Sequence, residues 1–294
     1  MKLVDSISRM ATLARMYKKE GKSIGFVPTM GALHEGHLSL VRTAKKHTDV
    51  VVISIFVNPI QFGETEDLDK YPRDIKRDEE LARTAGADII FYPPVSQMYT
   101  DGYSTYVFVE GLTDTLCGAS RPGHFKGVAT VVTKLFGIVK PDIAYFGQKD
   151  AQQAIVIKKM VEDLNVGIEI KVLPIVREED GLAMSSRNAY LSEEERRDAT
   201  VLYRSLEKAE GMTKHGEKDP KKIIKAVTEM ITEVPGAKID YVSIVDTKSL
   251  KNVDKISQEV LIAIAVYIGK TRLIDNIMVK PVPEAHSARK GLAV

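Results

Sequence analysis

The chain has 294 residues, 44% of them hydrophobic and 28% charged, and 42 basic against 40 acidic side chains give a net charge of +2. This composition is typical of a globular protein of one or two domains and excludes a disordered chain. The balanced charge offers no broad basic surface, so neither a nucleic-acid nor a membrane partner is expected. The longest apolar run, residues 260–268, is too short to span a bilayer. We expect a cytoplasmic protein in which Cys117, the single cysteine, is a buried filler.

Up to about residue 176, short apolar segments alternate with amphipathic ones. The apolar segments predict strands at 24–27, 50–56, 88–92, 143–146 and 168–173, and the amphipathic ones predict helices at 38–47, 74–85, 126–139 and 150–164. This order predicts an α/β fold with a parallel sheet covered on both faces. Because ligands bind beyond the carboxyl ends of such strands, the loops of interest begin at Pro28, Asn58, Pro93 and Gly147.

The pattern changes after Arg177. A capping box at Ser192–Glu195 predicts a helix that runs to about residue 211, and Asp219-Pro220 begins another. Three β-rich segments follow, at 239–245, 260–267 and 273–279. Two helices followed by three strands indicate a smaller α+β domain with a short antiparallel sheet. We therefore expect domains at 1–176 and 177–280, and a loose tail at 281–294.

The segment Pro28–His37 is the most informative part of the chain. It connects a predicted strand to a predicted helix through a glycine-containing turn, with His34 and His37 in the first helical turn. A helix N-terminus presents free N–H groups and a partial positive charge, so this arrangement suits phosphate. Imidazolium groups at this position could also donate hydrogen bonds to phosphate as charge builds. The turn predicts chemistry on a nucleoside triphosphate.

Two other interpretations of His34 and His37 stay open at this point. They could be solvated side chains at the start of a helix, or two ligands of a metal. The spacing does not match the metalloprotease motif, and the other four histidines form no second cluster. A P-loop is not expected, because Gly21-Lys22-Ser23 and Gly269-Lys270-Thr271 both lack the upstream glycine.

Two further loop segments have phosphate-binding character. Phe146–Asp150 combines a glycine turn, Lys149 and a helix start, although a helix cap with a solvated lysine is an equal alternative. Met184–Asn188 places hydroxyls and the Arg187 guanidinium on a loop that could close on phosphates.

Amide side chains are the candidates for binding a small polar substrate. Gln61 follows a predicted buried strand, and Gln153 lies one turn into a predicted helix, where a plain surface position is the alternative. Three aspartates suggest magnesium, but a solvated acidic loop is the preferred interpretation; they are Asp67, Asp69 and Asp74.

Taken together and in this order, the motifs resemble the pantoate–β-alanine ligase family over nearly the whole chain. The matching segments are Pro28–His37, Phe56–Phe62, Arg121–Phe125, Phe146–Asp150 with Gln153, Met184–Asn188 and Arg272–Asn276. The resemblance implies a Rossmann-like fold shared with class I aminoacyl-tRNA synthetases. It also implies two ATP motifs of that superfamily, His-x-Gly-His at His34–His37 and a variant of the Lys-Met-Ser-Lys-Ser loop at Met184–Arg187.

The resemblance also implies residue roles. The implied catalytic residues are His37, as proton donor or cationic stabiliser of the α-phosphate, with His34, Lys149 and Arg187. The implied ATP-contacting residues are Met30, Gly31, Ala32, Leu33, His34, Glu35, Gly36, His37, Gly147, Gln148, Lys149, Asp150, Val176, Met184, Ser185, Ser186 and Arg187. Gln61 and Gln153 would contact pantoate, and Gln61 would also contact β-alanine.

The implied reaction has two steps, formation of pantoyl adenylate with release of pyrophosphate, and displacement of AMP by the amine of β-alanine. Mg²⁺ is expected with ATP, no protein-bound metal is expected, and the family resemblance implies a homodimer. Three alternatives remain: a nucleotidyltransferase of the same superfamily with a phosphate-containing acceptor, a silent ATP sensor, and a metal-dependent hydrolase.

Overall fold

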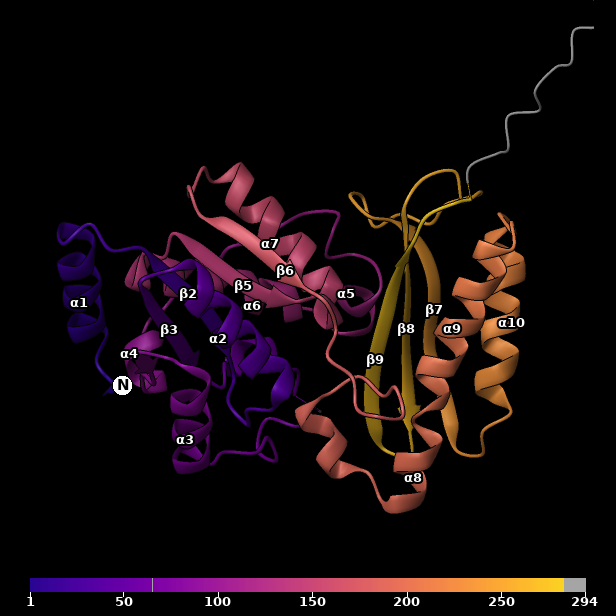
Figure 1. Ribbon diagram of the computed structural model, residues 1–294, viewed down its shortest axis with the longest axis horizontal. Coiled ribbons are helices and arrows are strands. Elements are labelled where there is room, and N and C mark those ends of the chain that lie inside the picture. The colour runs from indigo at the N-terminus through magenta and orange to yellow at the C-terminus, as the bar shows by residue number, and fades with distance from the viewer. Residues whose placement is uncertain (65, 283–294) are drawn as a thin grey trace, which may run out of the picture.

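The computed structural model describes residues 1–64 and 66–282 and contains two β-sheets (Figure 1). The larger sheet is parallel, with strand order β1-β4-β3-β2-β5-β6. Its strands are β1 (Lys2–Val4), β2 (Ile24–Thr29), β3 (Val50–Ile55), β4 (Ile89–Phe91), β5 (Ile143–Gly147) and β6 (Glu169–Leu173). The predicted α/β fold is confirmed. The short edge strand β1 was not predicted, because three residues are too few to show a periodicity.

Helices cover both faces of this sheet because successive strand residues point to opposite sides. Phe26 and Val52 pack on the face that carries α1, α6 and α7, whereas Val27 and Ile53 pack on the face that carries α2 and α3. The helices are α1 (Ile7–Lys19), α2 (Glu35–His47), α3 (Ile75–Ala85), α4 (Val95–Met98), α5 (Cys117–Ser120), α6 (His124–Val139) and α7 (Ala151–Asp163).

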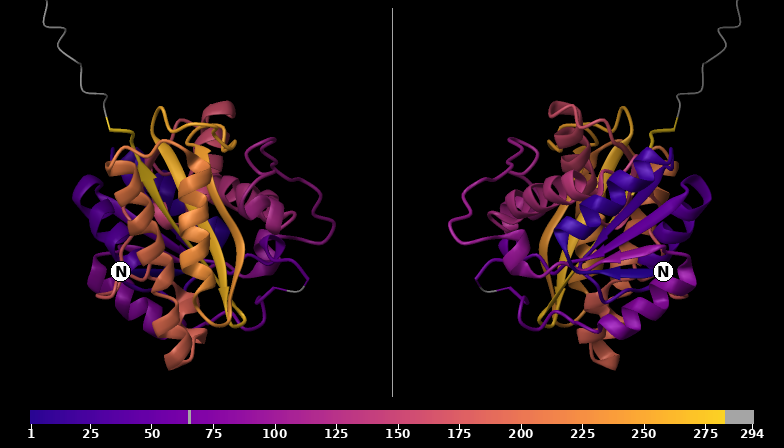
Figure 2. Two further views of the ribbon diagram at one scale, coloured as in Figure 1. Left: turned by 90° about the vertical axis from the view of Figure 1, so that its right-hand side faces the viewer. Right: turned by 90° about the vertical axis from the view of Figure 1, so that its left-hand side faces the viewer.

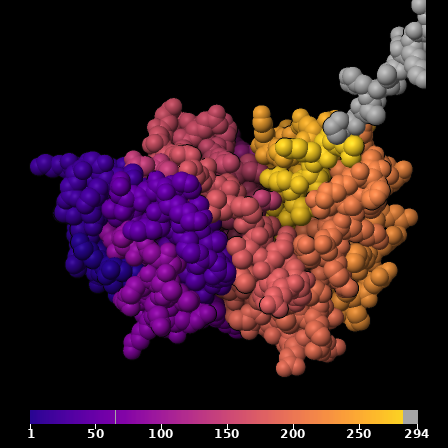
Figure 3. Space-filling model, in the orientation of Figure 1, coloured from indigo at the N-terminus to yellow at the C-terminus, as the bar shows by residue number. Residues whose placement is uncertain are grey.

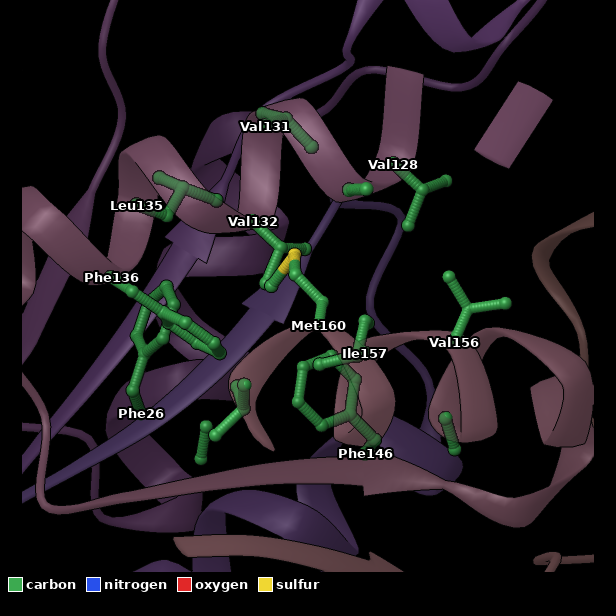
Figure 4. Close-up of a cluster of buried hydrophobic side chains, with 14 of the residues drawn as sticks. Phe26, Val128, Val131, Val132, Leu135, Phe136, Phe146, Val156, Ile157 and Met160 are labelled. Atoms are coloured by element: carbon green, nitrogen blue, oxygen red, sulfur yellow. The ribbon is translucent and has the colours of Figure 1, made fainter. Parts of the chain in front are cut away.

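The core beneath α6 and α7 holds this half of the molecule together (Figure 4). Phe26 of β2 meets Phe136 of α6 edge to face, with ring centroids 6.3 Å apart. Ile157 and Met160 of α7 are fully buried beside them. Each such side chain contributes roughly 1.5–3 kcal/mol through its burial. This packing fixes the strand ends from which the site is built.

The smaller sheet is antiparallel, with order β7-β8-β9, and α9 and α10 pack on one face (Figure 2). Its strands are β7 (Ala237–Asp246), β8 (Val260–Ile268) and β9 (Thr271–Val279), and its helices are α8 (Glu193–Asp198), α9 (Val201–Lys214) and α10 (Pro220–Thr232). In the space-filling view this part lies directly beside the first (Figure 3). Its other face joins the larger core, where Leu261 and Ala263 belong to the cluster of α6 and α7.

The helix predicted from the capping box is wrong in its extent. Ser192 and Glu195 form the capping box, but α8 stops at Asp198 and a separate helix begins at Val201. The N–H of Thr200 donates to the carbonyl of Arg197, only three residues back, at 3.3 Å, so the α-helical hydrogen-bond pattern is interrupted there. The predicted tail, 281–294, lies outside the described residues from 283 onward.

Candidate active site

The turn after β2 has a backbone that few sequences can adopt. Gly31 and Ala32 both have positive φ, 87° and 49°. A Cβ at Gly31 would lie 2.9 Å from the Asp78 carboxylate, so glycine is required there. That carboxylate accepts hydrogen bonds from the N–H groups of Ala32 and Leu33, at 2.9 and 2.7 Å. Asp78, on α3, therefore locks the turn that leads into α2.

The two histidines cap the N-terminus of α2 with their own rings. Nδ1 of His34 accepts from the N–H of Gly36 at 3.2 Å, and Nδ1 of His37 accepts from the N–H of His34 at 3.4 Å. The ring centroids are 4.0 Å apart. Because Nδ1 is an acceptor in both rings, a neutral imidazole carries its proton on Nε2. Each ring can therefore donate an Nε2–H without being charged.

Both histidines are neutral near pH 7 in the free chain. Burial, helped by the positive charge of Lys149, lowers the pKa of His34 to about 4. Burial lowers the pKa of His37 well below its usual value, and the neighbouring His34 and Lys149 add to this effect. The expectation of imidazolium groups refers to histidines beside phosphate, whose negative charge would raise both pKa values, and it stays a prediction. His37 is also half-buried rather than solvated.

The second turn follows β5 and is held by the smaller sheet. Gly147 leads into the short helix η2 (Gln148–Asp150). Asn276, a buried residue of β9, donates from its amide to the carbonyls of Gln148 and Lys149, at 3.0 and 2.9 Å. A strand from the smaller sheet therefore fixes the backbone that presents Lys149.

The third segment, Met184–Arg187, lies against the first turn. The N–H of Met184 donates to the carbonyl of Val176 at 3.0 Å, and the Ser186 hydroxyl donates to the carbonyl of Ala32 at 3.1 Å. Arg187 forms a two-point ion pair with Asp67, at 2.8 and 2.9 Å. The loop after β6 and the turn after β2 are therefore brought together by direct hydrogen bonding.

Gln61 is a buried and fully oriented amide at the end of the short helix η1 (Pro59–Gln61). The Asn58 amide donates to the side-chain oxygen of Gln61 at 3.0 Å. The Gln61 amide N–H in turn donates to Sδ of Met30 at 3.0 Å. Gly127 permits this arrangement, because a Cβ there would lie within 2.5–2.7 Å of backbone atoms of Ile60 and Gln61. The helix α6 therefore packs directly under the amide.

These segments surround one cavity of about 220 Å³ at the carboxyl ends of β2 and β5. Predicted site residues that line it are Met30, His34, Gly36, His37, Gln61, Gly147, Lys149, Asp150, Gln153, Val176, Met184, Ser185, Ser186 and Arg187. A second cavity, of about 730 Å³, shares Arg121, Lys149 and Gln153 with it and extends to β8 and β9.

Five predicted site residues do not line the smaller cavity with the others. Leu33 is fully buried in the core, and Glu35 is paired with Arg42 on the surface. Gly31 and Ala32 shape the turn through their backbone, and Gln148 bonds to Asn276. Their contribution to the site is through the backbone or through packing.

Several residues that matter for the geometry were missed from the sequence. Asp78 shares a helical face with Ala82 and Ala85 at spacings of four and seven, so an acid on an apolar stripe was the available signal. Asp67 was expected to be solvated but is paired with Arg187. Asp74 caps α3. The pairing of Arg177 with buried Asp275, at 2.6 Å, had no local signal.

The prediction for Cys117 is confirmed, since it is buried. Among residues 1–64 and 66–282, no group of three or more His, Cys, Asp or Glu side chains is arranged to hold a metal. Within the same described residues, no helix is long and apolar enough to cross a membrane.

In this chain the central parallel strand β2 leads through a glycine turn into the N-terminus of α2, and cationic loops surround that turn. This arrangement defines a nucleotide-binding α/β enzyme. The sequence matches the family model described as pantoate-beta-alanine ligase over residues 2–278. The chain therefore belongs to the pantoate–β-alanine ligase family, which confirms the resemblance seen in its motifs.

Individual relatives agree with this assignment. The pantothenate synthetase of Caldicellulosiruptor bescii is 59% identical over 280 residues, which cover 95% of this chain and 99% of the relative. The crystal structure of pantothenate synthetase from Thermus thermophilus superposes with a TM-score of 0.91 at 44% identity, covering 96% of this chain and all of the other. The ligase from Francisella tularensis, solved in complex with β-γ ATP and β-alanine, has a TM-score of 0.79 at 34% identity and covers 95% of this chain and 97% of that one.

Proposed function

We propose that the smaller cavity catalyses the reaction of the family, ATP-dependent condensation of (R)-pantoate with β-alanine to pantothenate, AMP and pyrophosphate. The observation that carries this proposal is the convergence of three phosphate-binding segments and two amide side chains, Gln61 and Gln153, on one cavity. The polyphosphate of ATP needs the phosphate-binding segments, and the hydroxyl-bearing acid pantoate needs the amide side chains. The reaction requires both kinds of group side by side.

In the first step, a carboxylate oxygen of pantoate attacks the α-phosphorus of ATP. The new O–P bond forms as the bond to the β-phosphate oxygen breaks, and pyrophosphate leaves. Nε2–H groups of His34 and His37 would donate to phosphate oxygens, with the N-terminus of α2 behind them. Lys149 and Arg187 would neutralise the departing pyrophosphate. The histidines supply directed Nε2–H donors, and the two cations supply positive charge.

In the second step, the amine of β-alanine attacks the pantoyl carbonyl carbon. The C–N bond forms, the C–O bond to AMP breaks, and the proton that the neutral amine loses passes to solvent water. The adenylate is a good leaving group, so the protein mainly aligns the reactants. Gln61 would contact both pantoate and β-alanine, and Gln153 would contact pantoate. Gln61 suits this role because its amide is buried and held at both ends.

Several remaining features are part of the proposal. Mg²⁺ would enter with ATP, since a divalent cation offsets polyphosphate charge, and chelation should then abolish turnover. The protein would act in the cytoplasm, which cell fractionation tests. The chain would divide into domains at 1–176 and 177–280, supported by the two sheets, although the core under α6 extends into the second.

We also propose a homodimer. Residues 103–109, which lie in no helix or strand, combine β-branched and aromatic side chains, and Phe108 and Tyr106 are 55% and 43% exposed. Exposed apolar side chains in one segment are typical of an interface. Light scattering should give about twice the mass of one chain, and Phe108→Glu should shift the protein toward monomer.

The test of the proposed reaction is AMP formation from ATP, pantoate and β-alanine, with each omitted in turn. AMP should appear only when all three are present, while pantoate alone should support exchange of pyrophosphate into ATP. A nucleotidyltransferase with a phosphate-containing acceptor would keep the nucleotide in its product and release no AMP. An ATP sensor would bind ATP and give neither signal.

A further inference from the structure

Arg121 is a half-buried cation that the proposed reaction leaves without a task. It lies at the end of α5, its side chain is only 15% exposed, and it lines both cavities. Its guanidinium is held in a two-point ion pair with Glu66, from Nε to Oε1 at 2.7 Å and from Nη2 to Oε2 at 2.5 Å. Burial opposes ionisation of Glu66, but the hydrogen bond and charge of Arg121 outweigh it and lower the pKa of that carboxyl.

A chain of hydrogen bonds ties Arg121 to Gln61. Nη1 of Arg121 lies 3.1 Å from Nε2 of His124, and a guanidinium can only donate, so Nε2 is the acceptor. The proton of His124 therefore sits on Nδ1, which donates to the carbonyl of Gln61 at 2.9 Å. Burial, with Arg121 beside it, lowers the pKa of His124 to about 4, so the ring stays neutral at pH 7. The guanidinium is thus positioned relative to Gln61.

The anions of the reaction can be assigned to cations one by one. ATP phosphates belong with Lys149 and Arg187, because Lys149 acts on both His34 and His37, and the Arg187 loop is bonded to Ala32. The pantoate carboxylate is the nucleophile and is consumed. The carboxylate of β-alanine survives the reaction unchanged and still needs a partner. Arg121 is the remaining guanidinium that lines the smaller cavity.

We propose that Arg121 binds the carboxylate of β-alanine, and that Glu66 occupies this position in the free protein. The inference rests on the proposed function. Glu66 presents a carboxylate on a two-carbon stem, which is also the length between the carboxylate and the amine of β-alanine. Two-point pairing with a guanidinium is the geometry by which proteins select carboxylates. Substrate entry would then exchange one carboxylate for another, so the half-buried guanidinium is never left without a counter-charge.

The experiment compares β-alanine with its neutral amide, β-alaninamide, in the wild type and in Arg121→Gln. The wild type should prefer β-alanine by about 30-fold or more in kcat/KM, as expected for a charge-assisted pair. In Arg121→Gln the KM for β-alanine should rise by a similar factor and the preference should fall to within about threefold of unity. Pantoate-dependent pyrophosphate exchange, which needs no β-alanine, should change by less than about threefold.

Two further variants keep the test decisive. Glu66→Gln removes the competing carboxylate and should lower the KM for β-alanine about threefold without affecting β-alaninamide. Arg73→Gln is the matched control, because Arg73 bonds the same loop through the carbonyl of Leu68 and should leave the preference unchanged. An unchanged preference for β-alanine over β-alaninamide in Arg121→Gln would overturn the proposed carboxylate site at Arg121. A higher KM for β-alanine in Glu66→Gln would overturn it as well. Absence of exchange in the wild type would overturn the proposed function itself.

Discussion

The turn after β2 and the loop at Met184–Arg187 both face the same cavity, but they are held in different ways. The turn is fixed by the buried Asp78 carboxylate and by the two half-buried capping histidines. The loop is held by the Ser186 hydroxyl and by an ion pair between half-buried Arg187 and Asp67. We infer that the turn is preorganised for ATP, whereas the loop must exchange partners when phosphate arrives.

The largest effect is expected for the preorganised turn. His37→Ala removes an Nε2–H donor and should slow pantoate-dependent pyrophosphate exchange by about 100- to 1,000-fold. It also removes a cap of α2, so the free energy of unfolding should fall by about 1 kcal/mol. The exposed His215→Ala serves as control. Exchange at the wild-type rate in His37→Ala would contradict the role of the turn.

Asp78→Asn tests whether the turn is locked from α3. An amide has one acceptor oxygen, so one of the two N–H groups of Ala32 and Leu33 loses its partner. This should cost about 1–3 kcal/mol in urea unfolding and raise the KM for ATP about tenfold. The KM for β-alanine should stay nearly constant. A loss of stability with an unchanged KM for ATP would show that Asp78 is structural alone.

The neutral histidines predict a pH dependence of stability. The folded-state pKa of His34, about 4, lies below its unfolded value, so the unfolded chain binds the proton first. The free energy of unfolding should hold above about pH 6.5 and fall between about pH 6.5 and 4. His34→Gln should lose part of this fall between about pH 6.5 and 4, measured against His215→Gln. If the free energy of unfolding changes with pH equally in His34→Gln and His215→Gln, His34 does not titrate in this way.

The smallest effect is expected for the exchangeable loop. Asp67→Asn removes the charge that competes with phosphate for Arg187 and should lower the KM for ATP about threefold. Asp69→Asn, two residues further along the same loop, is the matched control. If Asp67→Asn instead raises the KM for ATP, the ion pair orders the loop for binding rather than competing with it.

Much of the fold could be predicted because it is encoded locally. The apolar runs around Phe26 and Val52 required strands buried on both faces, and Ser192 with Glu195 indicated a helix start. The break at Thr200 was missed because residues 197–202 contain no proline or glycine that would mark the end of a helix. Likewise β1 gains its identity from pairing with β4, which lies far along the chain.

The sequence by itself determined the family, the two-sheet order and the segments that meet at the site, because motifs and hydrophobic periodicity are properties of neighbouring residues. Only the tertiary structure decided the charge of the histidines, since burial sets their pKa. It also decided the partners of each charged group: Asp78 under the turn, Asp67 on Arg187 and Glu66 on Arg121. These pairs join residues 45 to 120 positions apart, and such contacts exist only after the chain has folded.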